Sequence, residues 1–445
     1  MGNAPVNPIA DVNAVSPTRG QAKWAALGLG VALCIPSLGV VQRYFGNWGT
    51  VIYLLAGAVG LLLLLRSRVA VAQWAARRSQ RQVIWMAALT FTVILAAFVV
   101  VYPLANSHRP DAGSDGDDAL NVAVNELIHG RYPYYPSTYL GNPISPLPGA
   151  VLLAVPFVLL GSSAYQNLFW LFVFLLAMRT YLHGGRSALL LLWVILALSP
   201  AFWYALVTGS DYMANALYVL LFSLWLIRAA SRSRGSGVRA FLLAGLLGVG
   251  LSSRANFLLL LPLIFVALGR VADLKTAAKL TVIVGLAFGA TTLPFYLFDP
   301  GGFSPLHTTD ELGRFDVVLS HAGLIIPLLT VALALLLALW PRAWPEQVND
   351  GRVQEARGRI YADDVTAAFF RNSALVLALP VFCGLALYCV GLRRLYFGFA
   401  TFGVFFLFFG AVPAWRMLFG PVSPGPAPGV AANVFESTDK VGPPT

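Results

Sequence analysis

The sequence predicts an all-α polytopic membrane protein with about twelve transmembrane helices. The chain of 445 residues is 58% hydrophobic and only 11% charged, whereas a soluble domain carries about 25% charged residues. The apolar residues gather in blocks close to the ~20 residues that cross the hydrocarbon core of a bilayer. A water-soluble protein of this composition could not cover its own surface, so the lipid bilayer is the first expected partner.

The apolar blocks divide into predicted spans, and the predicted ranges are 24–43, 48–65, 83–104, 164–182, 187–207, 211–230, 238–252, 255–271, 276–298, 320–341, 372–391 and 395–416. The residues before the first block are polar and rich in proline, unlike a cleavable signal peptide. We therefore expect a disordered cytoplasmic tail over 1–23, a transmembrane domain over 24–420 and a disordered tail over 421–445.

The distribution of basic residues orients the predicted spans. The segment 66–81, after the second predicted span, contains several arginines and no acidic residue, so this loop is expected to be cytoplasmic. Both termini then lie in the cytoplasm. The Lys and Arg residues left outside are Arg43, Arg109, Arg131, Arg254, Arg314, Arg393 and Arg394. The net charge of +11 is thus interpreted as a topology signal, and no nucleic-acid partner is expected.

The longest outer loop, predicted over 105–163, carries an acidic cluster followed by a short helix. The aspartates are Asp111, Asp115, Asp117 and Asp118. Apolar residues from Leu120 to Ile128 repeat at helical spacing, and Gly130 ends the helix. This one-sided helix is expected to lie on the membrane surface. A second apolar segment opens with prolines and runs to about Leu160, as a half-buried helix rather than a span.

Three interpretations of the aspartates stay open. One of them could cap the helix, with Ser114 and Asp117 as a pair or with Asp117 or Asp118 alone. The cluster could also be a solvated acidic turn. The functional alternative is a carboxylate at the outer face that acts as a general base on an acceptor hydroxyl, or that binds a cation. Neighbouring carboxylates raise one another's pKa, which suits a base.

The layout of this region resembles the GT-C glycosyltransferases. It consists of an acidic residue after a span, an amphipathic helix, the run Gly130-Arg131-Tyr132-Pro133-Tyr134 and a proline-led apolar helix. The run is similar to that of bacterial polyprenol-phosphate-mannose-dependent mannosyltransferases, and the resemblance covers about 83–270. It implies a catalytic carboxylate in this loop at the spacing of Gly116, which Asp115 and Asp117 flank. Asp117 ranks first, Asp115 second and Asp118 third.

Other outer residues are candidates for binding the donor phosphate. Arg254 lies between two apolar runs, where an arginine is costly and often functional, and guanidinium pairs well with phosphate. The alternative is a short loop from which Arg254 reaches the surface. Arg393 and Arg394, near the outer end of the eleventh span, are further candidates for the phosphate.

A second group of outer residues is predicted to shape the acceptor side of the cavity. These residues are Glu126, Tyr134, Asp211 and His307. Asp211 has an alternative role as the cap of its span. The loop that holds His307, Asp310 and Glu311 is expected to close over the site.

The function implied by the resemblance is an inverting glycosyltransferase of the plasma membrane, active on its outer face. It moves a sugar, with mannose as the first candidate, from a polyprenyl-phosphate donor to an envelope glycan or glycolipid acceptor. No cofactor is required by this chemistry. A divalent cation stays open, because some relatives need one, but no ligand set is visible. The alternatives are a transporter or flippase of lipid-linked saccharides and a non-catalytic membrane subunit of an envelope assembly.

Overall fold

The computed structural model describes residues 19–107, 115–233, 237–307, 312–346, 355–391 and 398–420. Within these ranges the chain is helical, with an isolated antiparallel bridge between Ser137 and Pro143. The helices are, in order, α1 (Arg19–Cys34), η1 (Ile35–Ser37), α2 (Leu38–Ala76), α3 (Gln80–Ala105), α4 (Gly116–Ile128), α5 (Pro148–Leu159), α6 (Tyr165–Tyr181), α7 (Gly185–Leu198), α8 (Pro200–Val207), α9 (Asp211–Ser233), α10 (Val238–Leu251), η2 (Ala255–Leu260), α11 (Leu261–Val271), α12 (Leu274–Phe298), η3 (Ser304–His307), η4 (Arg314–Val317), α14 (Ala322–Leu339), η5 (Pro341–Ala343), α15 (Glu355–Gly391), η6 (Gly398–Gly403) and α16 (Val404–Phe419). The all-α prediction is confirmed for the described residues.

The described helices also confirm a polytopic membrane protein. Seven are long and apolar enough to cross a membrane, or eight when α7 and α8, which meet at 90°, count as one broken span. Large apolar side chains face outward on these helices, such as Trp85, Leu89 and Val100 of α3. Lipid accepts such a surface and water does not. The number twelve stays a prediction, because α10 and α11 are short apolar helices.

The first two predicted spans form a helical hairpin that reverses at Gly46. A Cβ added to Gly30 would strike Leu61, and one added to Gly57 would meet Sγ of Cys34 at 3.0 Å. Residue numbers therefore rise on one arm as they fall on the other, which makes the arms antiparallel. Gly46 has φ 66° and ψ −169°, a conformation that side chains other than glycine rarely tolerate. Glycine at this position allows the two helices to pack side by side.

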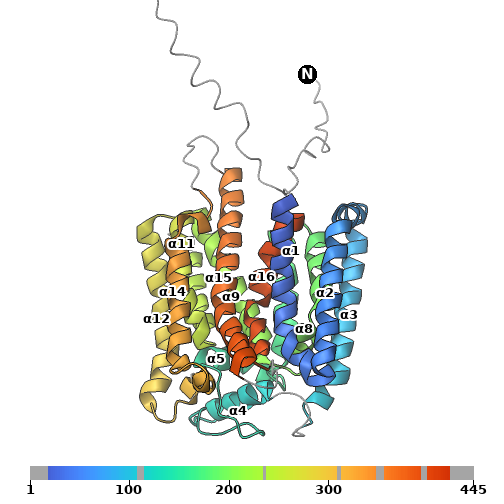
Figure 1. The fold of residues 1–445 in the computed structure, drawn as a ribbon. Helices are drawn as coiled ribbons and strands as arrows, with labels where there is room; N and C mark the ends of the chain where they lie inside the picture. The colour runs from blue at the N-terminus through green and yellow to red at the C-terminus, as the bar shows by residue number, and fades with distance from the viewer. Residues whose placement is uncertain are drawn as a thin grey trace, which may run out of the picture.

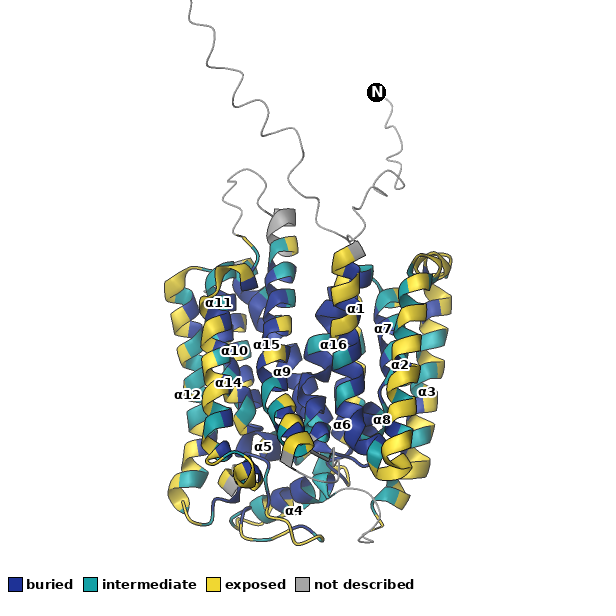
Figure 2. Ribbon diagram, in the orientation of Figure 1, coloured by how far each residue is buried: buried dark blue, intermediate teal, exposed yellow. Residues whose placement is uncertain are grey.

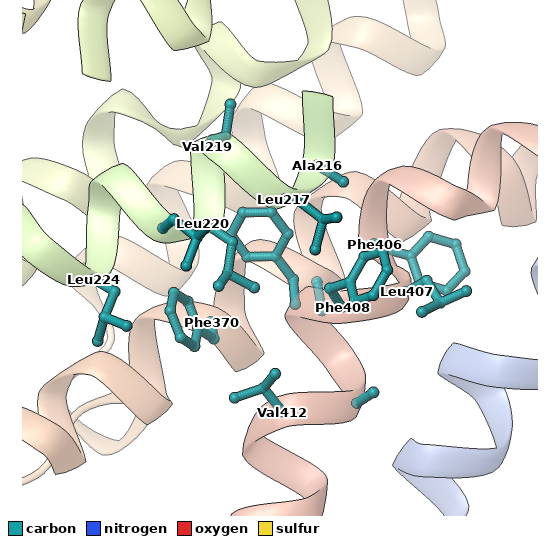
Figure 3. Packing of buried hydrophobic residues seen from close by; sticks show 14 of the residues in the cluster. Ala216, Leu217, Val219, Leu220, Leu224, Phe370, Phe406, Leu407, Phe408 and Val412 are labelled. Carbon is teal, nitrogen blue, oxygen red and sulfur yellow. The ribbon is translucent and has the colours of Figure 1, made fainter. Parts of the chain in front are cut away.

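Helices α9 and α16 form the centre of the bundle. In their most apolar windows 89% of α9 residues and 72% of α16 residues are buried, against 17% in α12 and 22% in α3. Figure 2 shows this division, with buried residues in the middle and exposed ones on the flanking helices. Leu217 of α9 lies beside Phe406 and Phe408 of α16, as Figure 3 shows. The outer helices are thus left to face lipid.

Helix α15 begins at Glu355, well before the predicted start of its span at 372. Two acidic residues in this extension, Asp363 and Asp364, bind Arg228 of α9 and Arg416 of α16. Because the arginines neutralise these two carboxylates, the part of α15 that carries them can enter the bundle. The sequence could not show this, because the partners lie far away in the chain.

Helix α4 lies across one end of the bundle, which we call the α4 end (Figure 1). Helix α5 has one buried face, which consists of Ala150, Val151 and Ala154. The backbone N–H of Gly149, at the start of this helix, donates to the carbonyl of Ser252 at 2.7 Å. With 12 residues the helix is too short to cross a bilayer. Described α1 begins, and α16 finishes, at the opposite end, which agrees with an even number of crossings.

The close packing of α10 on α12 gives a stability test. A Cβ at Gly248 would meet Ala287 at 2.6 Å and strike the Val284 carbonyl, whereas nothing lies within 4 Å of one at Gly245. We expect Gly248→Ala to destabilise the fold by about 1–3 kcal/mol through overpacking. Gly245→Ala, the matched control in the same helix, should be neutral or slightly stabilising. Thermal unfolding in detergent measures both, and equal melting temperatures would contradict the packing.

Candidate functional site

Helix α4 presents its aspartates at the beginning of the helix. Its buried residues include Ala119, Leu120, Ala123 and Val124, which pack with α5 in one apolar cluster. Gly130 follows the helix with φ +71°, the left-handed conformation expected after a helix end. The helix predicted at this position is confirmed. Its first turn projects acidic residues toward α3 and the loop that precedes α5.

Two of the three aspartates bind the loop over 138–142. Asp115 Oδ2 accepts hydrogen bonds from Thr138 Oγ1 at 2.6 Å and from Asn142 Nδ2 at 2.8 Å. Asp118 Oδ2 accepts one from the backbone N–H of Tyr139 at 2.8 Å. Asp115 is also the N-cap residue, yet its side chain makes no capping hydrogen bond. These carboxylates therefore fix the loop onto α4.

Asp117 is the aspartate that points into the protein. Its residue is fully buried, and Oδ2 accepts a hydrogen bond from the Tyr102 hydroxyl of α3 at 2.7 Å. Tyr102 also contacts Ser162 Oγ at 2.6 Å and accepts from Asn106 Nδ2 at 3.1 Å. Asp117 Oδ1 and Asn106 Oδ1 are buried acceptors that find no partner among the described residues. Such oxygens are costly to leave unpaired, so a donor group from outside the described residues fits here.

Burial raises the pKa of Asp117 to about 6. The Tyr102 hydrogen bond lowers this pKa, and the charge of Asp118 raises it by a smaller amount. A carboxyl group with this pKa is mostly ionised at pH 7 and still accepts a proton readily. These are the properties of a general base that works near neutral pH.

A tight turn over 208–212 packs directly on Asp117. Gly209 has φ +71°, and a Cβ there would lie 3.0 Å from Cβ of Asp117 and 2.7 Å from that of Ala164. Glycine is therefore required by both conformation and space. The next helix, α9, starts at Asp211, so any shift of this turn would be transmitted to both carboxylates.

Asp211 and Arg254 form a buried ion pair. Arg254 Nη2 donates to Asp211 Oδ2 at 2.6 Å and to Oδ1 at 2.8 Å, while Nε donates to Oδ2 at 3.2 Å. Nη1 donates to Ser145 Oγ at 2.9 Å, and the guanidinium lies 4.9 Å from the ring centroid of Tyr212. Arg254 is 7% exposed and Asp211 is fully buried. The interpretation of Arg254 as a surface-reaching side chain is therefore wrong, and Asp211, the first residue of α9, is an ion-pair partner and not only a cap.

A cavity of about 340 Å³ opens beside this turn. Ser210 and Tyr212 line one side of it, and Arg43 and Tyr204 line another. Arg43 is exposed, donates to the Tyr204 hydroxyl at 3.4 Å and has no carboxylate within ion-pair distance in the described parts of the chain. Sequence reasoning gave Arg43 no role, although its outer position against the positive-inside rule was a signal.

The charges of both the aspartates and Arg43 act on the phenol of Tyr139. Burial raises the pKa of its phenol, the charges of Asp115, Asp117 and Asp118 raise it further, and the charge of Arg43 lowers it. The Tyr139 ring therefore lies within electrostatic range of both groups. The acidic cluster and the cationic wall of the cavity belong to one region at the α4 end.

Of the remaining predicted site residues, the two described ones, Glu126 and Tyr134, form no hydrogen bond or ion pair with Asp117. Glu126 forms an exposed ion pair with Arg131 at 2.5 Å. Tyr134 is buried and packs edge-on against Phe303 and Phe295. Arg393, Arg394, Asp310 and Glu311 lie outside the described residues, as does the side chain of His307. No group of three or more His, Cys, Asp and Glu suited to a metal occurs in the described ranges.

A double-mutant cycle tests the ion pair. Arg254→Gln and Asp211→Asn should each destabilise the protein by about 3–5 kcal/mol, because either leaves a buried charge unpaired. The double variant should cost much less than the sum. Unfolding in detergent gives the free energies. The exposed pair Glu126→Gln/Arg131→Gln is the control and should show no measurable coupling. Additive costs at Asp211 and Arg254 would rule out a direct pair.

Comparisons with known protein families, curated proteins and solved structures find no match to this chain. The GT-C resemblance therefore stays a prediction that rests on the residues of the outer loop. The parts of the site are Asp117, the turn over 208–212 and the cavity lined by Arg43.

Proposed function

We propose that the chain is a membrane glycosyltransferase that moves a sugar from a polyprenyl-phosphate donor to an acceptor hydroxyl at the α4 end. The observation that carries this proposal is Asp117, a buried carboxylate with a pKa of about 6 and one oxygen without a described partner. A base of this kind has a use only if a proton donor reaches it. The acceptor hydroxyl is that donor.

The proposed step is a single displacement with inversion. The acceptor oxygen attacks the anomeric carbon while Asp117 Oδ1 takes its proton. The bond from that carbon to the phosphate oxygen breaks, and the lipid phosphate leaves with the electron pair. Because the leaving group is already an anion of low basicity, it needs a cation beside it rather than a general acid.

We assign that cation to Arg43. Arg254 was the first candidate from sequence, but three of its nitrogens already donate to Asp211 and Ser145. Arg43 lines a cavity of about 340 Å³, where its contacts are a hydrogen bond to the Tyr204 hydroxyl and the Tyr44 ring, 5.7 Å from the guanidinium, with no described carboxylate beside it. The exposed rings of Phe45 and Trp48 lie close to Arg43 in the chain, at the hairpin turn, and offer a lipid-borne donor an apolar route to the cavity. Arg254 instead holds the turn that packs on Asp117.

The distribution of buried charge favours this function over a transporter of lipid-linked saccharides. In the described chain the fully or nearly buried charged residues are Asp117, Asp211, Arg254 and Asp363. The first three gather at the α4 end and Asp363 lies at the opposite end, with the apolar α9–α16 core between them. A transport path calls for polar residues through that core. A non-catalytic subunit gives no reason for a buried carboxylate with an unpaired oxygen.

The mannose identity, the envelope acceptor, the plasma membrane location and the outer position of the α4 end belong to the same proposal. They are supported by the resemblance of the loop and by the basic residues of the predicted cytoplasmic loops. The cytoplasmic position of both termini is part of it as well.

Asp117→Asn should lower transfer by about 10²–10⁴-fold, the usual contribution of a general base. In the unmodified protein the rate should fall as the pH drops through about 6, because protonation removes the base. Membranes supplied with a radiolabelled polyprenyl-phosphate sugar provide the assay. Glu126→Gln on the same helix is the control and should stay active. Full transfer by Asp117→Asn would refute the assignment.

Arg43→Gln should raise the KM for the donor by at least about tenfold, since a charge-assisted contact to phosphate is lost. Arg43→Lys should recover part of it. The neutral pair Asp211→Asn/Arg254→Gln should keep donor affinity. If the double variant lost donor affinity while Arg43→Gln kept it, Arg254 rather than Arg43 would be the residue that binds the phosphate.

A further inference from the structure

A second cavity, of about 390 Å³, lies at the end of the bundle opposite α4 and is lined by three arginines. Arg228 and Arg232 come from the last turns of α9, and Arg239 from the first turn of α10. Thr180 of α6 and Trp225 of α9 also line this cavity. The two helices converge there, so the arginines face a shared space rather than separate patches of solvent.

Only the innermost arginine is neutralised within the described residues. Arg228 donates from Nη2 and Nε to Asp363 Oδ1 at 2.8 and 3.0 Å. Arg232 and Arg239 are exposed and form no ion pair with any described carboxylate. The cavity therefore keeps an excess of positive charge that the described carboxylates do not balance.

Other arginines at this end are used by the fold itself. Arg186 donates to the carbonyl of Arg78 at 2.5 Å, and Arg371 donates to that of Ala343 at 2.6 Å. Arg416 binds Asp364 at 2.6 Å. A general excess of basic residues at one side of a membrane explains their number, but it does not explain two guanidinium groups on one cavity that have no ion-pair partner among the described residues.

The surface beside the cavity is suited to a lipid chain. Arg239, Leu242 and Leu246 lie at helical spacing on one face of α10, and the two leucines are 65% and 44% exposed. If a phospholipid bound its phosphate at Arg239, its acyl chains would thus lie along an apolar stripe that already faces lipid. Guanidinium groups match phosphate oxygens in geometry and charge.

We infer that this cavity binds the headgroup phosphate of an anionic phospholipid, held by Arg232 and Arg239 and backed by Arg228. The site is separate from the α4 end and does not depend on the proposed transfer reaction. Its ligand would bridge the ends of α9 and α10, where the chain between them is short.

The test is lipid retention by the purified full-length protein, measured by native mass spectrometry with added phosphatidylglycerol or phosphatidylcholine. The unmodified protein should retain phosphatidylglycerol preferentially. Arg232→Gln/Arg239→Gln should weaken that retention by tenfold or more, on the order expected for two basic residues near a membrane surface. Arg228 is left intact because it holds Asp363.

Lys275→Gln/Arg342→Gln removes two charges from exposed positions outside this cavity and is the matched control, expected to retain the lipid. Equal retention by the cavity variant and the unmodified protein would overturn the inference, as would equal binding of the two lipids. Displacement of phosphatidylglycerol by inorganic phosphate at low millimolar concentration would show a soluble phosphate site, and would overturn the lipid as its source.

Discussion

The buried pair of Asp211 and Arg254 is the interaction on which the α4 end depends. It joins the start of α9 to the junction of α10 and η2, and through Ser145 it reaches the loop before α5. Two charges removed from lipid and water are tolerated only when their hydrogen bonds are satisfied, and here the guanidinium uses three nitrogens on protein oxygens. The turn over 208–212 is fixed as a result.

That fixed turn decides the environment of Asp117. Gly209 lies against the aspartate with no room for a side chain, so the carboxylate is enclosed between α3, α4 and the turn. Enclosure removes water and raises the carboxyl pKa, while Tyr102 keeps one oxygen bonded. One ion pair thus fixes the turn that packs on Asp117. The division of labour between a structural arginine, Arg254, and a cavity arginine, Arg43, follows from the same arrangement.

The apolar core explains why charge gathers at the two ends of the bundle. Helices α9 and α16 are buried along most of their length by aliphatic and aromatic side chains, which leaves no partners for a charge at mid-height. Buried charges therefore occur toward the two ends of the bundle, where a partner side chain, loop backbone or solvent can help to satisfy them. The α4 end carries the buried carboxylate of Asp117, and the opposite end carries the arginine cavity.

Much of this organisation could be predicted from the chain alone. Hydropathy and composition indicated the helical membrane protein, because a bilayer demands long apolar helices, and the apolar repeat after Leu120 with Gly130 indicated α4. The ranking of Asp117 first among the aspartates stays a prediction, and its burial agrees with it. Hydropathy could not fix the number of spans, because short, bent and buried helices such as α10 and α8 depart from the simple length rule.

The sequence by itself determined that this protein belongs in a membrane, because its composition permits no other solvent. It also determined which local segments are helical and where the acidic loop lies. Only the tertiary structure decided which aspartate is buried, that Arg254 is paired with Asp211, and that Arg43 lines a cavity. The physical reason is distance along the chain: burial and ion pairing join residues from separate helices, and no local pattern records which helices meet.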